Sequence, residues 1–546
     1  MTKSSHTKES LYSELQRIPL EINNYNEMKI THSKKTILFL IIGIGLSLFI
    51  QTSCVNSKNE GALKVPVQLQ VSETNRHLLE TIDGKPVFIN NYTAWQLLKN
   101  GTRESVTEFF ELLKEQKFNM VSAVLFTDRV DGEYCNDTSA YGNLPFFCDS
   151  LGNPNPLKPI VTQGNDFDDR KAYDYWDQVD FTIDKAAECG MYICLHPTWG
   201  KWVAGSYFKK VPGDRLVFDK TSAYKYGVWL GKRFGGKENV IWMVGGDRSA
   251  INTLENEVQD FREVWNAMAE GVADGKNGVD NFDGNADYSN ILISYHPRKW
   301  APNSSEWFHN EKWLAFNSIQ DTPYDQIVSV PNDYKLKPVK PTWLFEGRYE
   351  GATSDWAVRY QAYQTVLDGG FGVTYGSENY RFPANWRENM KLPGVAQMTY
   401  LYYVIREIWT DKEFLNRIPD PNLIIGDRGD TRGDGMTVDD GDGGPDAKKK
   451  PNAISDRITA MRSSDGSWAM VYSANGRDIA LDLTLLKSGK MDAYWFNPRT
   501  GKWWSNEKES AQPTPFYTDI LNAGNNLLFK APGIPEPGND WLLVLR

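Results

Sequence analysis

The sequence predicts an α/β fold, a (β/α)8 TIM barrel followed by a small antiparallel β-sandwich. From about residue 75 to 380, short apolar or β-branched runs alternate with amphipathic stretches that place apolar residues three or four positions apart. That alternation is typical of βα units. Eight such runs can be counted, which is the number that closes a barrel. After residue 452 the helical pattern stops and short strand-like runs follow one another.

The eight runs are the expected barrel strands, and the amphipathic stretches between them are the expected crossover helices. The strands are predicted at residues 86–90, 118–126, 191–197, 239–247, 290–297, 313–320, 341–350 and 371–377. The helices include residues 103–116, 175–190, 223–236 and 257–272. Because 546 residues exceed what one ordinary domain needs, a second domain is expected.

The barrel is predicted to occupy residues 68–426 and the sandwich residues 452–546. Between them, residues 427–451 are rich in Gly, Asp and Lys and are interpreted as a loop or linker, with a calcium-binding loop as the alternative. The sandwich is either a sugar-binding module or a domain that caps the barrel. Trp503 and Trp504 are neighbours on one strand and should face opposite ways, so at least one is expected in a core.

The first 54 residues form an N-terminal extension with an export signal. Residues 36–50 are apolar, follow Lys34 and Lys35, and precede a cysteine at position 54, a layout typical of a bacterial lipoprotein signal peptide. We therefore expect lipidation of Cys54, a start of translation at Met28, and a protein anchored to the bacterial outer membrane, facing the periplasm or the cell surface. A single-pass membrane anchor is the alternative.

Cysteine usage and charge limit the possible ligands. An exported protein can form disulfides, and Cys135 and Cys148, which flank one polar insertion, are a plausible pair, whereas Cys189 and Cys194 are expected to be free thiols. No Cys or His spacing resembles a zinc site, and no metal or cofactor is expected. The net charge of −10 and the lack of a long basic run argue against nucleic acid as a partner.

The candidate site is the barrel mouth, because TIM-barrel active sites form at the carboxyl ends of the strands. Polar residues end or closely follow every predicted strand, which a purely structural barrel would not require. They are Asn90, Asn91, Asp128, His196, Asp247, His296, Gln320, Asp321, Glu346, Tyr375 and Glu378.

Two of these residues, Asp247 and Glu346, form the candidate catalytic pair. Hydrolysis of a glycosidic bond needs one carboxyl group that protonates the leaving oxygen and a second carboxylate across the sugar ring. Asp247 ends the fourth strand after Gly245 and Gly246, and Glu346 ends the seventh. The alternative for each is a helix cap or an ion pair with the arginine nearby in sequence. Both together point to a glycoside hydrolase.

Several long motifs resemble, in order, those of the apiosidase-like glycoside hydrolases, barrel enzymes that hydrolyse side chains of plant pectin. They are HPTWG, AYKYGVWLGKRF, NVIWMVGGDRS, SYHPRKWAPNSSEWF, KPTWLFEGRYE, GGFGVTYGS and LPGVAQM. The resemblance covers about residues 68–420. The segment with AYWFNPRTGKW is similar to the sandwich that commonly follows this barrel and is labelled as collagen-binding.

The resemblance implies roles for individual residues. Asp247 would be the acid/base and Glu346 the nucleophile of a retaining enzyme. Contacts with the substrate would come from Trp95, His196, Trp199, His296, Gln320, Tyr349 and Tyr375. For the two histidines, hydrogen bonding to a neighbouring carboxylate is an equally open interpretation.

The chain departs from the family pattern at two motifs, which bears on the sugar it accepts. The first family motif reads Asp-Thr-Ala-Trp, whereas this chain begins it with Tyr92. The sixth begins Asp-Phe-Asn and continues Gln-Ser-Gly-His, whereas this chain has Ala315 for the Asp and no His in the run ending at Thr322. An Asp and a His are thus missing from the expected ring, and we expect the sugar subsite to differ.

The sequence thus predicts an exo-acting, retaining glycosidase that removes apiose, or another pentose or deoxy sugar, from a pectin-like polysaccharide or oligosaccharide. A barrel that has lost activity and binds glycans at the cell surface is the alternative. A third hypothesis, adhesion to a host protein through the sandwich, rests on the label of that domain alone.

Overall fold

A computed structural model gives the fold of the chain. It describes residues 66–127, 138–205, 216–254, 257–298, 303–320, 326–429, 437–439, 449–451, 456–487, 490–522 and 524–546. The export signal with Cys54, most of the Gly- and Asp-rich loop, Asp128, Cys135 and Asp321 lie outside these residues. Within the described residues, no helix combines the length and apolar character needed to cross a lipid bilayer.

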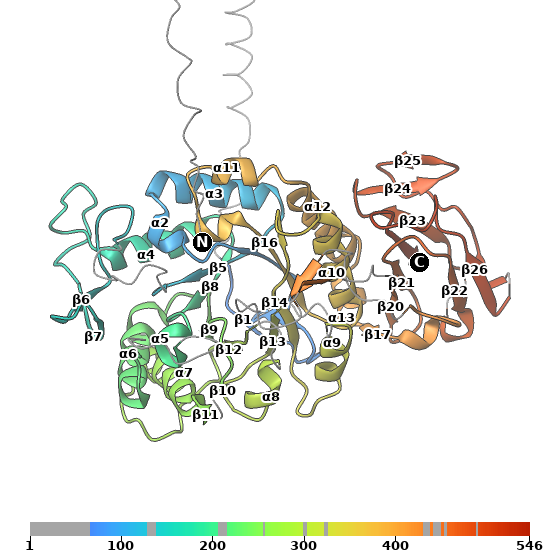
Figure 1. Cartoon of the computed structure of the whole chain (residues 1–546). Coiled ribbons are helices and arrows are strands. Elements are labelled where there is room, and N and C mark those ends of the chain that lie inside the picture. The colour runs from blue at the N-terminus through green and yellow to red at the C-terminus, as the bar shows by residue number, and fades with distance from the viewer. Residues whose placement is uncertain are drawn as a thin grey trace, which may run out of the picture. The chain divides into compact units, whose positions relative to one another are not determined.

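Eight parallel strands form a closed barrel, as the sequence predicts (Figure 1). They are β4 (Ile89–Thr93), β5 (Met120–Val124), β8 (Tyr192–His196), β9 (Val240–Gly245), β12 (Ile293–His296), β13 (Asn317–Gln320), β14 (Thr342–Glu346) and β16 (Gly372–Ser377). Between β12 and β13 the Ala315 amide donates to the Ile293 carbonyl at 2.8 Å, and the Ser294 hydroxyl donates to the Phe316 carbonyl at 2.6 Å. These contacts close the ring.

Helices surround the barrel strands (Figure 1). Four of the long ones begin with side-chain caps, from Thr102, Asp174, Asp219 and Ser354, which accept hydrogen bonds from free backbone amides of the first turn. The α-helices are α2 (Leu97–Asn100), α3 (Arg103–Glu115), α4 (Tyr175–Glu188), α5 (Lys201–Ala204), α6 (Lys220–Phe234), α7 (Arg262–Asn277), α8 (Ser304–Phe308), α9 (Gln326–Tyr334), α10 (Asp355–Leu367), α11 (Trp386–Asn389), α12 (Pro393–Tyr402) and α13 (Asp411–Leu415). Short helical turns are η2 (Glu378–Arg381), η3 (Tyr403–Glu407), η4 (Pro421–Leu423), η5 (Leu483–Leu485) and η6 (Ile520–Asn522).

The first barrel strand lies further along the chain than predicted. Residues 86–90 divide between β3 (Pro86–Val87), which joins β1 (Leu69–Val71) and β2 (Leu79–Thr81) in a small antiparallel sheet, and the start of β4. Asn90 and Asn91 therefore lie within β4 rather than at its end. The Asn91 amide donates to the Ser122 and Thr374 hydroxyls at 2.8 and 3.1 Å, which explains how a polar residue is accommodated inside the barrel.

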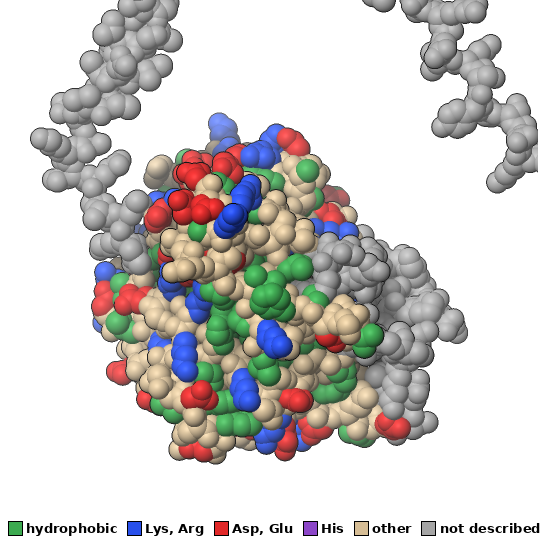
Figure 2. Space-filling model, turned by 90° about the vertical axis from the view of Figure 1, so that its left-hand side faces the viewer, with side chains coloured by type: hydrophobic (Ala, Val, Ile, Leu, Met, Phe, Trp, Pro, Cys, Tyr) green, Lys and Arg blue, Asp and Glu red, His purple; other side chains and the backbone are tan. Residues whose placement is uncertain are grey.

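Two β-hairpins extend from loops after barrel strands. The pair β10 (Ile251–Leu254) and β11 (Glu257–Asp260) includes residues that were predicted to start a helix. The pair β6 (Phe146–Cys148) and β7 (Pro154–Pro159) follows β5, and Cys148 is in a disulfide, whereas Cys189 and Cys194 are free. On the side of the molecule that carries this hairpin, hydrophobic side chains gather in the middle of the surface (Figure 2).

The C-terminal sandwich is confirmed. Its first strand lies before residue 426, where the barrel was expected to end. β17 (Arg417–Pro419) pairs with β20, so the seven-stranded sheet has the order β17-β20-β21-β27-β23-β24-β25. The other sandwich strands are β20 (Ile458–Ser463), β21 (Ala469–Ser473), β22 (Ile479–Asp482), β23 (Ala493–Asn497), β24 (Lys502–Ser505), β25 (Lys508–Ser510), β26 (Asn526–Phe529) and β27 (Trp541–Leu545). β22 and β26 form a second, two-stranded sheet, and β18 (Thr437–Asp439) pairs with β19 (Lys449–Pro451) in the preceding loop.

Both faces of the seven-stranded sheet contribute to hydrophobic cores. Val471 and Leu543 belong to the domain's own core, whereas their neighbours Tyr472 and Leu542 belong to one continuous core with the barrel. Side chains alternate between the faces of a strand, and the two tryptophans follow this rule. Trp503 is buried in the core shared with the barrel, and Trp504 packs on the other side. The structure therefore supports a domain that caps the barrel.

Candidate active site

A strained turn positions the first candidate carboxyl group. Gly245, Gly246 and Asp247 all have positive φ, at 95°, 110° and 57°. A Cβ atom on Gly245 would lie 2.5 Å from the His296 carbonyl oxygen, and one on Gly246 would lie 2.7 Å from the Gly200 nitrogen. Only glycines permit this approach of the neighbouring strands. The left-handed conformation of Asp247 costs about 1–2 kcal/mol, and a strained residue at a strand end is typical of a functional site.

The second candidate, Glu346, is held by neighbours from three other positions around the mouth. Its Oε1 atom accepts the Tyr349 hydroxyl at 2.8 Å. Its Oε2 atom accepts the Gln320 amide at 3.0 Å and lies 2.8 Å from Nε2 of His296. Both carboxylate oxygens are thereby fixed in orientation.

Trp95 fixes the direction of the hydrogen bond between Tyr349 and Glu346. The indole nitrogen of Trp95 donates to the Tyr349 hydroxyl oxygen at 2.8 Å. Because an indole can only donate, the proton of Tyr349 is left to point at Glu346. Gly376 makes room for this tyrosine, since a Cβ atom there would overlap its ring.

Two buried histidines, His196 and His296, line up behind the Glu346 carboxylate. His196 Nε2 lies 3.2 Å from His296 Nδ1, and both side chains are fully buried. Burial, and then the proximity of His296, hold the pKa of His196 well below its usual range, so this ring is neutral. His196 therefore contacts His296, and His296 Nε2 in turn lies 2.8 Å from Oε2 of Glu346. Neither ring is open to a substrate, so the expected contacts with the substrate are not seen. The structure favours the alternative interpretation, in which the histidines contact a neighbouring carboxylate.

The environment of Asp247 makes it a proton donor near neutral pH. Burial, and then the negative charge of Glu346, raise the pKa of Asp247 to about 6, although Arg248, His296 and a hydrogen bond from Gln320 oppose the shift. Arg248 remains 3.9 Å away and directs other donors to the carbonyls of Gly205 and Asp247. The ion pair between Asp247 and Arg248 is therefore long, which argues against a purely structural role for Asp247.

Aromatic side chains form the walls beside the two carboxyl groups. Trp95 and Trp199 have ring centroids 5.5 Å apart, and Trp199 is partly exposed. Tyr349 packs against Tyr380, with centroids 5.3 Å apart. Aromatic faces of this kind suit the apolar face of a sugar ring. Tyr380 was missed by the strand-end argument because it lies in η2, five residues beyond Tyr375.

Tyr375 does not join this group, which corrects the expected substrate contact. It is fully buried, and its hydroxyl donates to the Glu350 carboxylate at 2.6 Å. Glu350 in turn accepts the Gly394 amide at the start of α12. Successive residues of a strand face opposite sides, and Tyr375 is on the side of β16 that faces the helices.

The departures at positions 92 and 315 do not alter the mouth. Tyr92 packs against Phe109 of α3 and against Phe118, and its hydroxyl contacts Ser377, the last residue of β16, and Asn379 of η2. Ala315 precedes β13 at the amino end of that strand. The expectation that a missing Asp changes the sugar subsite is therefore not supported by these positions. Residues 321–325, where the family His would fall, lie outside the described residues.

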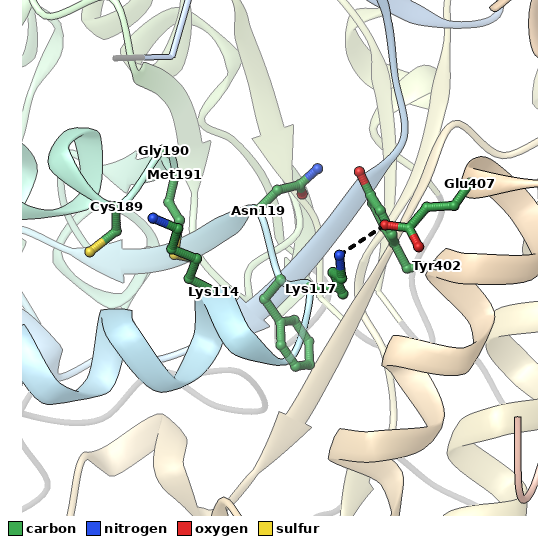
Figure 3. A pocket seen from close by; sticks show the side chains of 9 residues that line it. Lys114, Lys117, Asn119, Cys189, Gly190, Met191, Tyr402 and Glu407 are labelled. Carbon is green, nitrogen blue, oxygen red and sulfur yellow. Dashed lines mark ion pairs between the residues drawn. The ribbon is translucent and has the colours of Figure 1, made fainter. Parts of the chain in front are cut away.

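Two cavities lie at the opposite end of the barrel. One of about 350 Å³ is lined by residues that precede β5 and β8, among them Lys117 and Met191, and Lys117 forms a 3.1 Å ion pair with Glu407 there (Figure 3). Another, of about 460 Å³, is lined by residues that precede β12, β13 and β14. The amino ends of barrel strands serve stability, so neither cavity competes with the mouth as the active site.

Comparisons with known proteins identify the family of the chain and agree with its fold. Residues 72–411 match the family model described as "Apiosidase-like, catalytic domain", and residues 447–546 match one described as "Putative collagen-binding domain of a collagenase". No curated protein matches the chain. A crystal structure of a glycoside hydrolase family 5 protein from Bacteroides vulgatus is similar, with TM-score 0.65, 23% identity and coverage of 88% of this chain and 93% of that one. A second structure, titled "Glycoside hydrolase", has TM-score 0.64, 24% identity and coverage of 88% and 96%.

The raised pKa of Asp247 predicts a pH-dependent gain in stability for Asp247→Asn. Because the folded chain raises this pKa above its usual value, ionised Asp247 opposes folding above about pH 6, and this penalty vanishes below about pH 4. Asparagine stays neutral and tolerates a left-handed backbone. The free energy of unfolding of the variant should therefore exceed that of wild type at pH 8, by at most about 3 kcal/mol, and the gain should fade towards pH 4. The variant should accordingly have the higher melting temperature at pH 8.

Thermal melts of both proteins from pH 4 to 8 measure this difference. Asp260→Asn is the matched control, since hydrogen bonding from Arg262 lowers the pKa of exposed Asp260 and its variant should gain nothing as the pH rises. An Asp247→Asn gain that is equal at pH 4 and pH 8 would contradict the assignment.

Proposed function

The chain belongs to the apiosidase-like family, whose catalytic domain is a glycosidase, and on that premise we propose an exo-acting, retaining enzyme that removes a terminal sugar from a pectin-like polysaccharide. The observation that carries this proposal is the different treatment of two carboxyl groups at one mouth. Asp247 has a pKa raised to about 6, while Glu346 is bound by donors on both oxygens. Two carboxyl groups in such different environments can act as the acid (Asp247) and the nucleophile (Glu346) of one reaction.

The proposed reaction has two steps. Asp247 gives its proton to the glycosidic oxygen as Glu346 attacks the anomeric carbon, so the leaving group departs as an alcohol and the sugar becomes an ester of Glu346. Asp247, now ionised, takes a proton from a water molecule that attacks the same carbon. The sugar leaves as a hemiacetal of retained configuration, and both carboxyl groups return to their starting states.

The recessed position of the pair supports attack at a chain end. Only 25% of the Asp247 side chain and 13% of the Glu346 side chain are exposed. A terminal sugar can reach a recessed pair of carboxyl groups more easily than the middle of a continuous chain can. The family membership supports apiose or a related pentose or deoxy sugar as that terminal unit.

Neutralising either carboxyl group should abolish sugar release. Glu346→Gln removes the nucleophile and should lower kcat by more than about 10⁴-fold, and Asp247→Asn removes the acid and should cost about 10²–10⁴-fold. Monosaccharide release from pectic oligosaccharides, followed by chromatography, measures both. Asp260→Asn, which changes an exposed carboxylate on β11, is the control and should keep wild-type activity.

The same assay separates this proposal from its alternative. If wild-type protein releases no sugar from any pectic or other plant polysaccharide but binds one of them, the barrel is a glycan-binding protein and the proposed activity is wrong. If either active-site variant keeps near-normal turnover, the pair is wrongly assigned.

We further propose that the enzyme acts outside the cytoplasm, held by a lipid on Cys54. The support is the apolar run at residues 36–50 before that cysteine. Mass spectrometry of the mature protein should find an acylated Cys54 as the first residue, and Cys54→Ser should lose the acyl group. A mature chain that still carries residues 36–50 would instead indicate a membrane-spanning anchor.

A further inference from the structure

A buried ion pair joins the sandwich to the barrel. Asp540, just before β27, accepts two hydrogen bonds from Arg359 of α10, at 2.8 Å from Nε and 2.6 Å from Nη2. The side chains are 1% and 0% exposed, and the Tyr472 hydroxyl adds a third bond to Asp540 at 2.9 Å. A buried carboxylate with this many donors fixes the geometry of both partners.

The same arginine organises α10 and α12, which lie between the barrel strands and the sandwich sheet (Figure 1). Its Nη1 atom donates to Gln397 of α12 at 2.7 Å and to Asp355 of α10 at 3.0 Å. Gln397 also donates to Asp355 at 2.8 Å, which closes a ring of hydrogen bonds. Arg359 thus holds the two helices together, and Asp540 of the sandwich holds Arg359.

These two helices hold the turn that follows Glu346. From α10, the Gln361 side chain accepts the Arg348 amide at 2.8 Å. From the start of α12, the Gly394 amide donates to both oxygens of Glu350, at 3.2 and 3.0 Å. Between these two fixed points lies Tyr349, whose hydroxyl bonds Glu346.

We propose that Arg359 and Asp540 are positioning residues for Glu346, acting through α10, α12 and Tyr349. The sandwich is then part of the catalytic unit rather than a separate binding module. Nucleophilic attack tolerates displacements well below 1 Å, so loosening this clamp should slow the chemical step more than it weakens substrate binding. The kinetic part of this inference rests on the proposed glycosidase function.

Asp540→Asn tests the clamp, and the same interface offers a matched control. Asp368, at the end of α10, pairs with Arg457 of the sandwich at 3.1 Å, yet contacts none of the residues that hold the Glu346 turn. Asp540→Asn should lower kcat ten- to a hundredfold with KM changed less than about threefold. Asp368→Asn loosens a second, nearly buried interface pair that shares no partner with the Glu346 segment, so it should keep kcat within about twofold. Equal losses in the two variants, or wild-type kcat in Asp540→Asn, would overturn the proposal.

A second variant covers the case in which Asp540→Asn does not fold. Tyr472→Phe removes one hydrogen bond from Asp540 and leaves the ion pair in place. A drop in kcat of about threefold or more supports the clamp, and an unchanged kcat in the folded variant contradicts it.

A spectroscopic readout tests the clamp without any substrate. The Trp95 indole N–H donates to Tyr349, so its resonance in protein labelled with ¹⁵N-tryptophan, assigned with Trp95→Phe, reports the position of that tyrosine. Asp540→Asn should move or broaden this resonance and Asp368→Asn should not; no movement in Asp540→Asn contradicts the coupling. A wild-type protein that cleaves no glycan would refute the proposed function and leave this test intact.

Discussion

The arrangement at the barrel mouth depends on how the Glu346 carboxylate is held. Its neighbours come from separate strands: Gln320 from β13, His296 from β12, and Tyr349 from β15 (Tyr349–Glu350), a two-residue strand that pairs with β16. Trp95 lies behind Tyr349 and comes from the segment after β4. None of these contacts is local in sequence apart from that of Tyr349. The position of Glu346, the proposed nucleophile, therefore depends on barrel closure, and each strand must have its correct register.

The two carboxyl groups differ because their surroundings differ. Asp247 lies on a strained turn, buried near a like charge and with its arginine neighbour turned elsewhere, which favours its protonated form. Glu346 accepts hydrogen bonds on both oxygens, from Tyr349 and Gln320. Barrel strands set the distance between them, and the sandwich contributes through α10 and α12. A domain that resembles a collagen-binding module can thus serve the active site of its own chain.

The sequence was sufficient to predict the barrel and the sandwich, and to place Asp247, Glu346, Trp95 and Gln320 at one end of the barrel, because strand counting and the motifs point to that end. The catalytic roles of the two acids remain a proposal. The sequence was insufficient where a shift of one residue along a strand moves a side chain from the inside of the barrel to the outside. Asn91 and Tyr375 were placed at the mouth, but one bonds inside the barrel and the other faces the helices. Tyr380 and the pair Arg359–Asp540 depend on contacts between distant segments, which no local pattern reveals.

The most direct test of the account is to trap the sugar on the enzyme. A 2-fluoro glycoside of the released sugar, with a good leaving group, should slow the second step and leave a covalent ester that mass spectrometry can locate. The account predicts one added sugar on the peptide that contains Glu346, at residues 341–348. An adduct on Asp247 or another residue, or no adduct while the enzyme turns over its natural substrate, would contradict it.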